Sequence, residues 1–205
     1  MTAVTPKGRA TDEALKEAAR VVFARDGYLN AKISDIAAQA GRSAASFYNY
    51  YDTKADLLIA LAEEFHAEAT SLAILPFRAG LARPEALREA VAGFWRTYAK
   101  RRGELIGIFQ AAMIEGRFRD RWLELRGEVI TRIAGEVRAA QARGYCPGVD
   151  PVMTASALSA MLEHFCYIWL GQGGDKDVPF DGERALDAVA TIWVKAVYWR
   201  PEAGG

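Results

Sequence analysis

The chain has little of what supports redox, metal or disulfide chemistry. It contains two cysteines and two histidines in 205 residues. Cys146 and Cys166 lie far apart, and neither has a Cys or His partner at the spacing of a metal site. We therefore expect two reduced thiols, no metal and no cofactor, in a cytoplasmic protein.

An excess of charge of one sign and long apolar runs are also lacking. The 26 basic residues balance the 26 acidic ones, which gives a formal net charge of zero. Any affinity for a nucleic acid must then come from a local arrangement of side chains. The longest strongly apolar stretch, residues 165–170, is too short to cross a bilayer, and the N-terminal segment lacks the apolar core of a secretory signal. We expect no membrane partner.

Recognisable catalytic motifs are absent as well. The sequence shows no cluster of histidine and carboxylate, no nucleophile elbow, no phosphate-binding glycine loop and no pair of catalytic carboxylates. An enzyme on a helical scaffold is therefore the disfavoured hypothesis, and we predict a binding protein.

Helical periodicity runs through almost the whole chain, and no segment alternates as a strand does. We predict an all-α fold of about nine helices, with capping signals at Thr11 or Asp12 and at Asp150 and breaking signals at Gly27, Gly41 and Pro76. The expected helices cover residues 11–26, 33–40, 43–50, 54–75, 84–102, 104–114, 119–142, 151–170 and 181–199. The helices before about residue 52 are short and the later ones are long, which predicts domains at 1–52 and 53–205.

The most informative segment covers residues 33–51. Two short helices joined by a turn at Gly41 form a helix-turn-helix, which places its second helix in the DNA major groove. Phe47, with Tyr50 or Tyr51, is expected to anchor that second helix on the first helix of the chain. Small and polar side chains then face outward, where they can contact phosphates or base edges.

A set of matches in register makes this motif specific. They are Gly27-Tyr28, Asp35-Ile36-Ala37, Ala40-Gly41, Ser43, Phe47-Tyr48 and Tyr51-x-x-Lys54-x-x-Leu57-Leu58. Over residues 9 to 65 this pattern resembles the TetR family of repressors. The resemblance implies a homodimer with an N-terminal three-helix DNA-binding domain. It also implies a larger C-terminal helical domain that binds a small inducer and contributes the dimer interface.

The resemblance also assigns DNA-contacting positions. Tyr48 matches the family's phosphate-contacting tyrosine, and Lys54 matches a lysine at the start of the fourth helix, where a phosphate can bind beside the helix N-terminus. Lys7 and Arg9 are placed before the first helix, from which basic residues reach the duplex. The predicted DNA-binding set is Lys7, Arg9, Arg42, Ser43, Ala44, Ser46, Tyr48, Asn49 and Lys54.

Two positions depart from the family pattern. Ala31 stands where a threonine usually caps the second helix and contacts phosphate, so Asn30 is the alternative cap. Arg42 stands where a small apolar residue is usual; it either adds charge at the DNA backbone or lies over the helix pair. These departures motivate an alternative function, a helical small-molecule carrier with a weakened DNA-binding domain.

The C-terminal half is rich in large apolar residues, which mostly fill a helical core but also suit a ligand site. The residues expected to line that site are Phe94, Trp95, Tyr98, Phe109, Met113, Met161, His164 and Phe165. His164 has two interpretations, a hydrogen-bonded structural group or a ligand contact. An apolar or amphipathic effector fits this set: a fatty acyl chain, a sterol-like molecule or an aromatic drug.

The last two long helices carry broad apolar faces. In the family these helices pair with their symmetry mates as a four-helix bundle; the residues concerned are Leu158, Met161, Leu162, Phe165, Leu186, Val189, Trp193 and Val197. A twofold axis would set two recognition helices about 34–36 Å apart on a palindromic operator. The leading hypothesis is therefore a homodimeric repressor that a small effector releases from double-stranded DNA.

Overall fold

The computed structural model describes residues 5–201, and these residues form α-helices with no strand among them. The all-α fold class is confirmed. The helices are α1 (Pro6–Asn30), α2 (Ile33–Gln39), α3 (Ala44–Tyr48), α4 (Lys54–Arg78), α5 (Arg83–Lys100), α6 (Arg102–Ile114), α7 (Gly116–Gln141), α8 (Pro151–Cys166) and α9 (Gly182–Val197). A π-helical turn, Tyr167–Gly171, follows α8.

The chain folds as two compact units. The first comprises the chain up to Phe65 together with Arg101–Leu123, and the second comprises His66–Lys100 and the chain from Glu124 onward. The chain passes between them within α4, between α5 and α6, and within α7. Helix α6 therefore belongs to the same compact unit as the helix-turn-helix. The predicted division at residues 52 and 53 concerns functional roles and stays a prediction.

Helix α1 begins earlier than expected. The predicted start at Thr11 is wrong, because Thr5 caps a helix that starts at Pro6; its Oγ1 accepts a hydrogen bond from the Gly8 N–H at 3.1 Å. Proline suits this first position because it has no N–H to leave unpaired. Lys7 and Arg9 therefore lie within the first turns of α1 and not before it.

Of the other sequence signals for helix boundaries, those at Gly27 and Asp150 hold and the one at Pro76 fails. Gly27 does break α1, with φ 74° and ψ 160°. Pro76 was expected to end α4, but it lies inside the helix, which continues to Arg78. The last turn tolerates it because the Ala79 N–H still donates to the Leu75 carbonyl at 2.9 Å. Asp150 caps α8 as its sequence signal predicts, accepting from the Met153 N–H at 2.7 Å.

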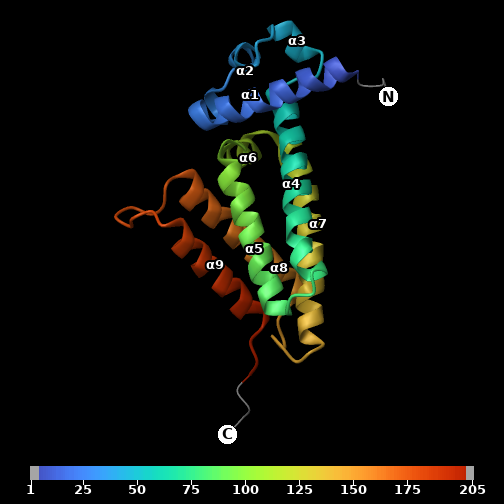
Figure 1. Ribbon diagram of the computed structural model, residues 1–205, viewed down its shortest axis with the longest axis vertical. Helices are drawn as coiled ribbons and strands as arrows, with labels where there is room; N and C mark the ends of the chain where they lie inside the picture. The colour runs from blue at the N-terminus through green and yellow to red at the C-terminus, as the bar shows by residue number, and fades with distance from the viewer. Residues whose placement is uncertain (1–4, 202–205) are drawn as a thin grey trace. The chain divides into compact units, whose positions relative to one another are not determined.

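The first unit is built around α1. Figure 1 shows α2 and α3 on one side of α1 and α6 on the other. Apolar side chains from four of its helices fill the core, and each of the following is completely buried: Leu15, Val22, Phe23, Ile36, Phe47, Leu57, Leu58 and Leu61. This core fixes α3, since the Phe47 side chain has no exposed surface.

The second unit packs α5 against α9, with α8 in contact with α9 (Figure 1). The apolar faces of α8 and α9 that were expected to pair across a twofold axis are largely buried within the second unit of a single chain. Leu158, Leu162, Val189, Trp193 and Val197 are all at most 6% exposed within one chain. These residues are therefore core, and the predicted dimer contact through them is wrong.

None of the helices among residues 5–201 is long and apolar enough to cross a membrane. Within the same residues, no group of three or more His, Cys, Asp or Glu side chains could hold a metal ion. Cys146 and Cys166 are both buried thiols.

Candidate nucleic-acid interface

The turn between α2 and α3 is held by backbone and side-chain hydrogen bonds. Gly41 adopts φ 64°, a conformation that glycine reaches without strain, and the Arg42 N–H donates to the Ala37 carbonyl at 2.9 Å. The Ser43 Oγ then caps α3 by accepting from the Ser46 N–H at 3.2 Å. These contacts make α3 a short helix of fixed direction on the surface of the first unit.

Most of the residues predicted to face DNA are exposed. On α3 and at its ends, Ser43, Ala44 and Asn49 are exposed and Tyr48 is 55% exposed, whereas Ser46 is half-buried. The tyrosine hydroxyl and the asparagine amide can donate to and accept from a DNA backbone or base edge. The exposed methyl group of Ala44 permits a close approach to the duplex.

Tyr51, and not Tyr50, is the aromatic anchor behind α3. Tyr51 is half-buried, its ring centroid lies 5.8 Å from that of Phe47, and its Oη donates to the Asp12 carboxylate. Burial, and then the bond to Asp12, raises the pKa of Tyr51, which keeps this hydroxyl a donor. Tyr50 is 36% exposed, so of the two tyrosines that were expected as anchors it is not the one that fills this role.

The structure gives Lys54 a role inside the first unit. Its Nζ donates to the carbonyls of Tyr28, Leu29 and Ala31 at 2.7, 3.2 and 3.1 Å, and it lies 4.5 Å from the centre of the Tyr28 ring. An ammonium group has three donors, and all three are used. A positive charge at these carbonyls also suits the C-terminal end of α1. We therefore leave Lys54 out of the proposed DNA-contacting set.

The connection from α1 to α2 explains the departure at Ala31. Ala31 is buried at 3% exposure, and α2 begins after Lys32 without a side-chain cap. Asn30 does not take over as cap, because it ends α1 and its Nδ2 donates back to the Asp26 carbonyl at 3.1 Å. The prediction for Asn30 is therefore wrong.

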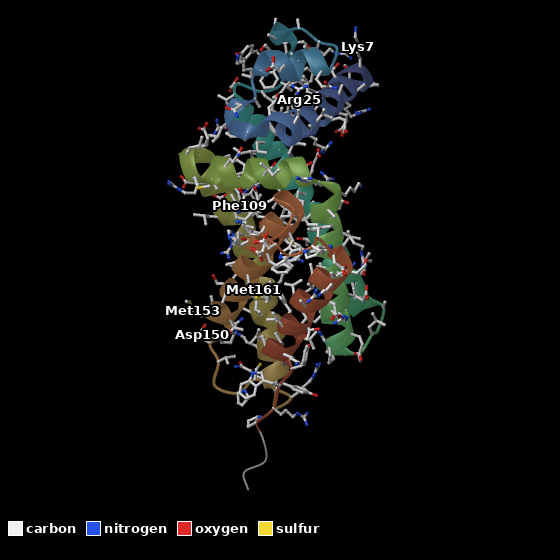
Figure 2. The ribbon with its side chains drawn as sticks, turned by 90° about the vertical axis from the view of Figure 1, so that its left-hand side faces the viewer. Lys7, Arg25, Phe109, Asp150, Met153 and Met161 are labelled. Carbon is white, nitrogen blue, oxygen red and sulfur yellow. The ribbon has the colours of Figure 1, made fainter. Side chains whose placement is uncertain are left out.

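Exposed basic side chains surround the helix-turn-helix. Lys7 projects from α1 on the side where α2 and α3 lie (Figure 2), and Arg9 is also exposed. Arg42 is exposed, and its guanidinium donates to the Gly41 carbonyl at 3.2 Å. Lys32, an exposed lysine at the start of α2, was missed by sequence reasoning. Its position immediately before the helix was the signal that could have identified it.

The residues predicted to line a ligand site are divided between the two units. Phe109 and Met113 lie on α6 in the first unit, and the other six lie in the second. Met113 is 76% exposed and His164 is exposed, so neither faces an interior, and we leave both out of the proposed site. In the second unit Trp95 and Phe165 bring their ring centroids to 6.1 Å, and Phe94 and Tyr98 bring theirs to 4.7 Å.

The same second unit holds a buried polar cluster that sequence reasoning did not connect. The Arg126 Nε donates to both Glu163 carboxylate oxygens at 3.2 and 3.1 Å, and these side chains are 16% and 14% exposed. Burial raises the pKa of Glu163, and Arg126 opposes that rise. Ser159, one turn before Glu163 on α8, is 4% exposed.

In the second unit, the Ser159 Oγ and the Trp193 Nε1 have no hydrogen-bond partner among residues 5–201, and both side chains are more than nine-tenths buried. Buried polar atoms are nearly always hydrogen-bonded, so each of these two atoms is available to bind a molecule from outside the chain.

An exposed helix-turn-helix in one unit, followed by a second helical unit rich in aromatic side chains, defines the class of helix-turn-helix transcriptional regulators. The model of the family "Bacterial regulatory proteins, tetR family" matches residues 15–61, and that of "Transcriptional regulator EthR, C-terminal domain" matches residues 87–199. The chain belongs to the TetR family of bacterial regulatory proteins, and it is a transcriptional regulator, not an enzyme.

Individual relatives agree with this assignment. The HTH-type transcriptional repressor NicS of Pseudomonas putida is 30% identical over 166 residues, which cover 78% of this chain and 76% of that protein. The HTH-type transcriptional regulator EthR of Mycolicibacterium smegmatis is 22% identical over 94% of this chain and 88% of its own. A TetR-family regulator from Syntrophomonas wolfei shares the fold with a TM-score of 0.79, at 16% identity over 96% of this chain and 99% of that one.

Proposed function

We propose that this regulator is a repressor that binds a palindromic operator as a homodimer and is released by a small effector bound in its second unit. The observation that carries the proposal is α3, a capped helix whose outward face presents Ser43, Ala44, Tyr48 and Asn49. Exposed basic side chains at Lys7, Arg9, Lys32 and Arg42 supply the attraction to phosphates that a chain of zero net charge otherwise lacks.

The proposed dimer uses the outer faces of α8 and α9. On α8 the exposed residues Met153, Ala157, Ala160 and His164 recur at helical spacing, and Figure 2 shows Met153 projecting outward near the start of this helix. On α9 the corresponding exposed residues are Ala188, Ile192 and Lys195, and the exposed Trp199 lies two positions after the end of the helix. Six of these eight positions carry apolar side chains, which suits a self-complementary contact.

Operator binding tests the proposal directly. A pool of random duplexes enriched on the purified protein should yield a palindromic site, bound with a dissociation constant of about 10⁻⁸ M or tighter. Light scattering of the complex should give an even number of chains per duplex. The affinity should fall steeply with salt concentration. If no enriched duplex binds better than random DNA, the protein is a small-molecule carrier instead.

Matched variants separate DNA contacts from structural residues in the same titration. Tyr48→Ala should weaken operator binding about tenfold with little loss of thermal stability, since its ring is largely exposed. Arg42→Met should lower the salt slope by about one if Arg42 contacts a phosphate. Lys54→Met should instead lower the melting temperature and leave the salt slope unchanged, because its donors bind carbonyls.

The proposed effector is a neutral amphipathic molecule with an apolar body. The aromatic side chains of α5 and α8 suit the apolar body, and the Ser159 Oγ and Trp193 Nε1 offer hydrogen bonds to a polar group. The buried guanidinium of Arg126 already binds Glu163, so a carboxylate on the effector would have to displace that residue. Removing a partner from such a pair is costly, and this disfavours an anionic effector.

A pair of matched ligands tests this chemistry. Decanol should raise the melting temperature and weaken operator binding, whereas decanoate at equal free concentration should do neither. A ligand at one hundred times its dissociation constant stabilises the fold by about 2.7 kcal/mol, which corresponds to a shift of roughly 5–10 °C. Ser159→Ala should reduce the decanol shift. A larger shift with decanoate, or with an aryl carboxylate over its alcohol, would contradict the proposal.

A further inference from the structure

At Gly103, helix α6 packs against α1 without space for a side chain at that position. A Cβ atom at Gly103 would lie 2.5 Å from the Arg20 carbonyl oxygen and 3.0 Å from the Ala24 Cβ. One turn further along α6, Gly107 is also buried, and a Cβ there would lie 3.3 Å from the Leu58 Cδ1. The backbones of α1 and α6 therefore approach closely at Gly103, which restricts sliding of α6 along α1, and at Gly107 α6 lies against a side chain of α4.

A buried ion pair fixes the N-terminal end of this contact. Glu104 has no exposed surface; its carboxylate accepts from the Arg20 Nε of α1 and from the Arg101 guanidinium at 3.1 Å. Burial raises the pKa of Glu104, and the two arginines oppose the rise. Arg20 also binds Glu64 of α4 at 2.8 Å, so three helices meet at this point.

The kink in α1 lies at the other end of the same contact. Gly27 leaves the helical conformation, so the next amides cannot all donate within α1. The Gln110 Oε1 of α6 accepts from the Tyr28 N–H at 2.7 Å and from the Leu29 N–H at 3.4 Å. From α4, Lys54 binds the carbonyls of the same segment.

This kinked segment leads directly into α2 and α3, the two helices of the helix-turn-helix. Only Ala31 and Lys32 separate the end of α1 from α2, and α2 connects to α3 through the Gly41 turn. The direction in which the chain leaves the kink therefore influences where α2 and α3 lie. Its amide donors are satisfied by one side chain, and that side chain belongs to α6, whose position on α1 is fixed by Gly103 and Glu104.

We propose that Gln110 is a positioning residue for DNA reading: its side-chain oxygen holds the kink after Gly27 and thereby sets the position of α2 and α3. The expected effect of Gln110 on DNA binding rests on the proposed function. The residue does not face the duplex in this role; it acts through the amides of Tyr28 and Leu29. A displacement of α6 would shift α2 and α3 through the hydrogen bonds of Gln110.

The test compares three single variants of the full chain. Gln110→Leu removes the acceptor, Gln110→Glu keeps an acceptor oxygen at the same reach, and Met113→Ala changes a 76% exposed side chain on the same helix. Hydrogen–deuterium exchange of residues 33–48, without DNA, should become about tenfold faster in Gln110→Leu and return towards the wild-type rate in Gln110→Glu. The enriched operator should bind Gln110→Leu about tenfold more weakly, and Met113→Ala as it binds wild type.

The exchange and DNA-binding measurements distinguish failure of the positioning role from failure of the operator proposal. Unchanged exchange in Gln110→Leu, or equal acceleration in Gln110→Glu, would overturn the positioning role whatever the DNA result. Faster exchange across all helices would mean a general loss of stability, which also overturns it. If wild type binds no specific duplex while exchange responds as expected, the operator proposal fails and the positional role of Gln110 stands.

Discussion

Replacing Arg126 by methionine is expected to lower the free energy of unfolding by about 3 kcal/mol at neutral pH. The substitution keeps much of the aliphatic volume but leaves the Glu163 carboxylate buried without its cation. It also removes the donor to the Ser156 carbonyl, which now binds the guanidinium at 3.1 Å. Urea unfolding followed by circular dichroism measures the loss.

The pH dependence of this variant follows from the sign of the Glu163 shift. Burial raises the pKa of Glu163 in the folded protein, and removing Arg126 removes the group that opposes the rise. The folded state then holds the proton more tightly than the unfolded state, so the destabilisation is complete above the raised folded pKa. It shrinks as the pH falls through that value towards the unfolded pKa of about 4.3.

Two controls make the result specific to the buried pair. Arg132→Met removes an exposed arginine from the same helix and should change the stability by less than about 0.5 kcal/mol. The double variant Arg126→Met with Glu163→Leu removes both charges and should recover most of the loss. A loss in Arg126→Met that does not diminish at low pH would show that the charge of Glu163 is not its cause.

Gly103→Ala is expected to cost about 2–3 kcal/mol, although alanine is ordinarily the better helix former. Its Cβ would lie 2.5 Å from a backbone carbonyl oxygen of α1, a group that can move only if the whole helix moves. The new methyl group would therefore push α1 and α6 apart and strain the Arg20–Glu104 pair. The melting temperature should fall by roughly 4–12 °C.

Gly135→Ala is the matched control, because nothing lies within 4 Å of a Cβ at that position on α7. There the substitution should stabilise the protein by about 0.5–1 kcal/mol through helix propensity alone. Gly107→Ala should have an intermediate effect, since its nearest neighbour is the flexible end of the Leu58 side chain. Equal responses at Gly103 and Gly135 would mean that α1 and α6 are not in close contact in solution.

Local signals in the sequence predicted much of the fold. The cap at Asp150 and the breaks at Gly27 and Gly41 lie where the sequence places them, because each depends on hydrogen bonds or dihedral angles within a few residues. The Thr5–Pro6 start of α1 was missed, although it is the same signal as Asp150–Pro151. The family pattern over residues 9–65 was recognisable because its spacing is specific.

The candidate site was predicted less completely. Exposure of Tyr48 and Asn49 follows from the burial of Phe47 one and two positions before them, which helical periodicity can indicate. The role of Lys54 could not be read in the same way. The carbonyls that it binds lie more than twenty residues earlier in the chain, and only the folded first unit brings them to its ammonium group.

The sequence by itself determined the all-helical fold, the helix-turn-helix and its outward face, since these depend on periodicity, caps and turns of short range. Tertiary structure alone decided which apolar faces of α8 and α9 are core, because an apolar stripe fits a neighbour in the same chain as well as one in a second chain. It also decided that α6 joins the helix-turn-helix unit, through Gly103, Glu104 and Gln110. Contacts between residues some eighty positions apart depend on how helices pack, and no local pattern records that.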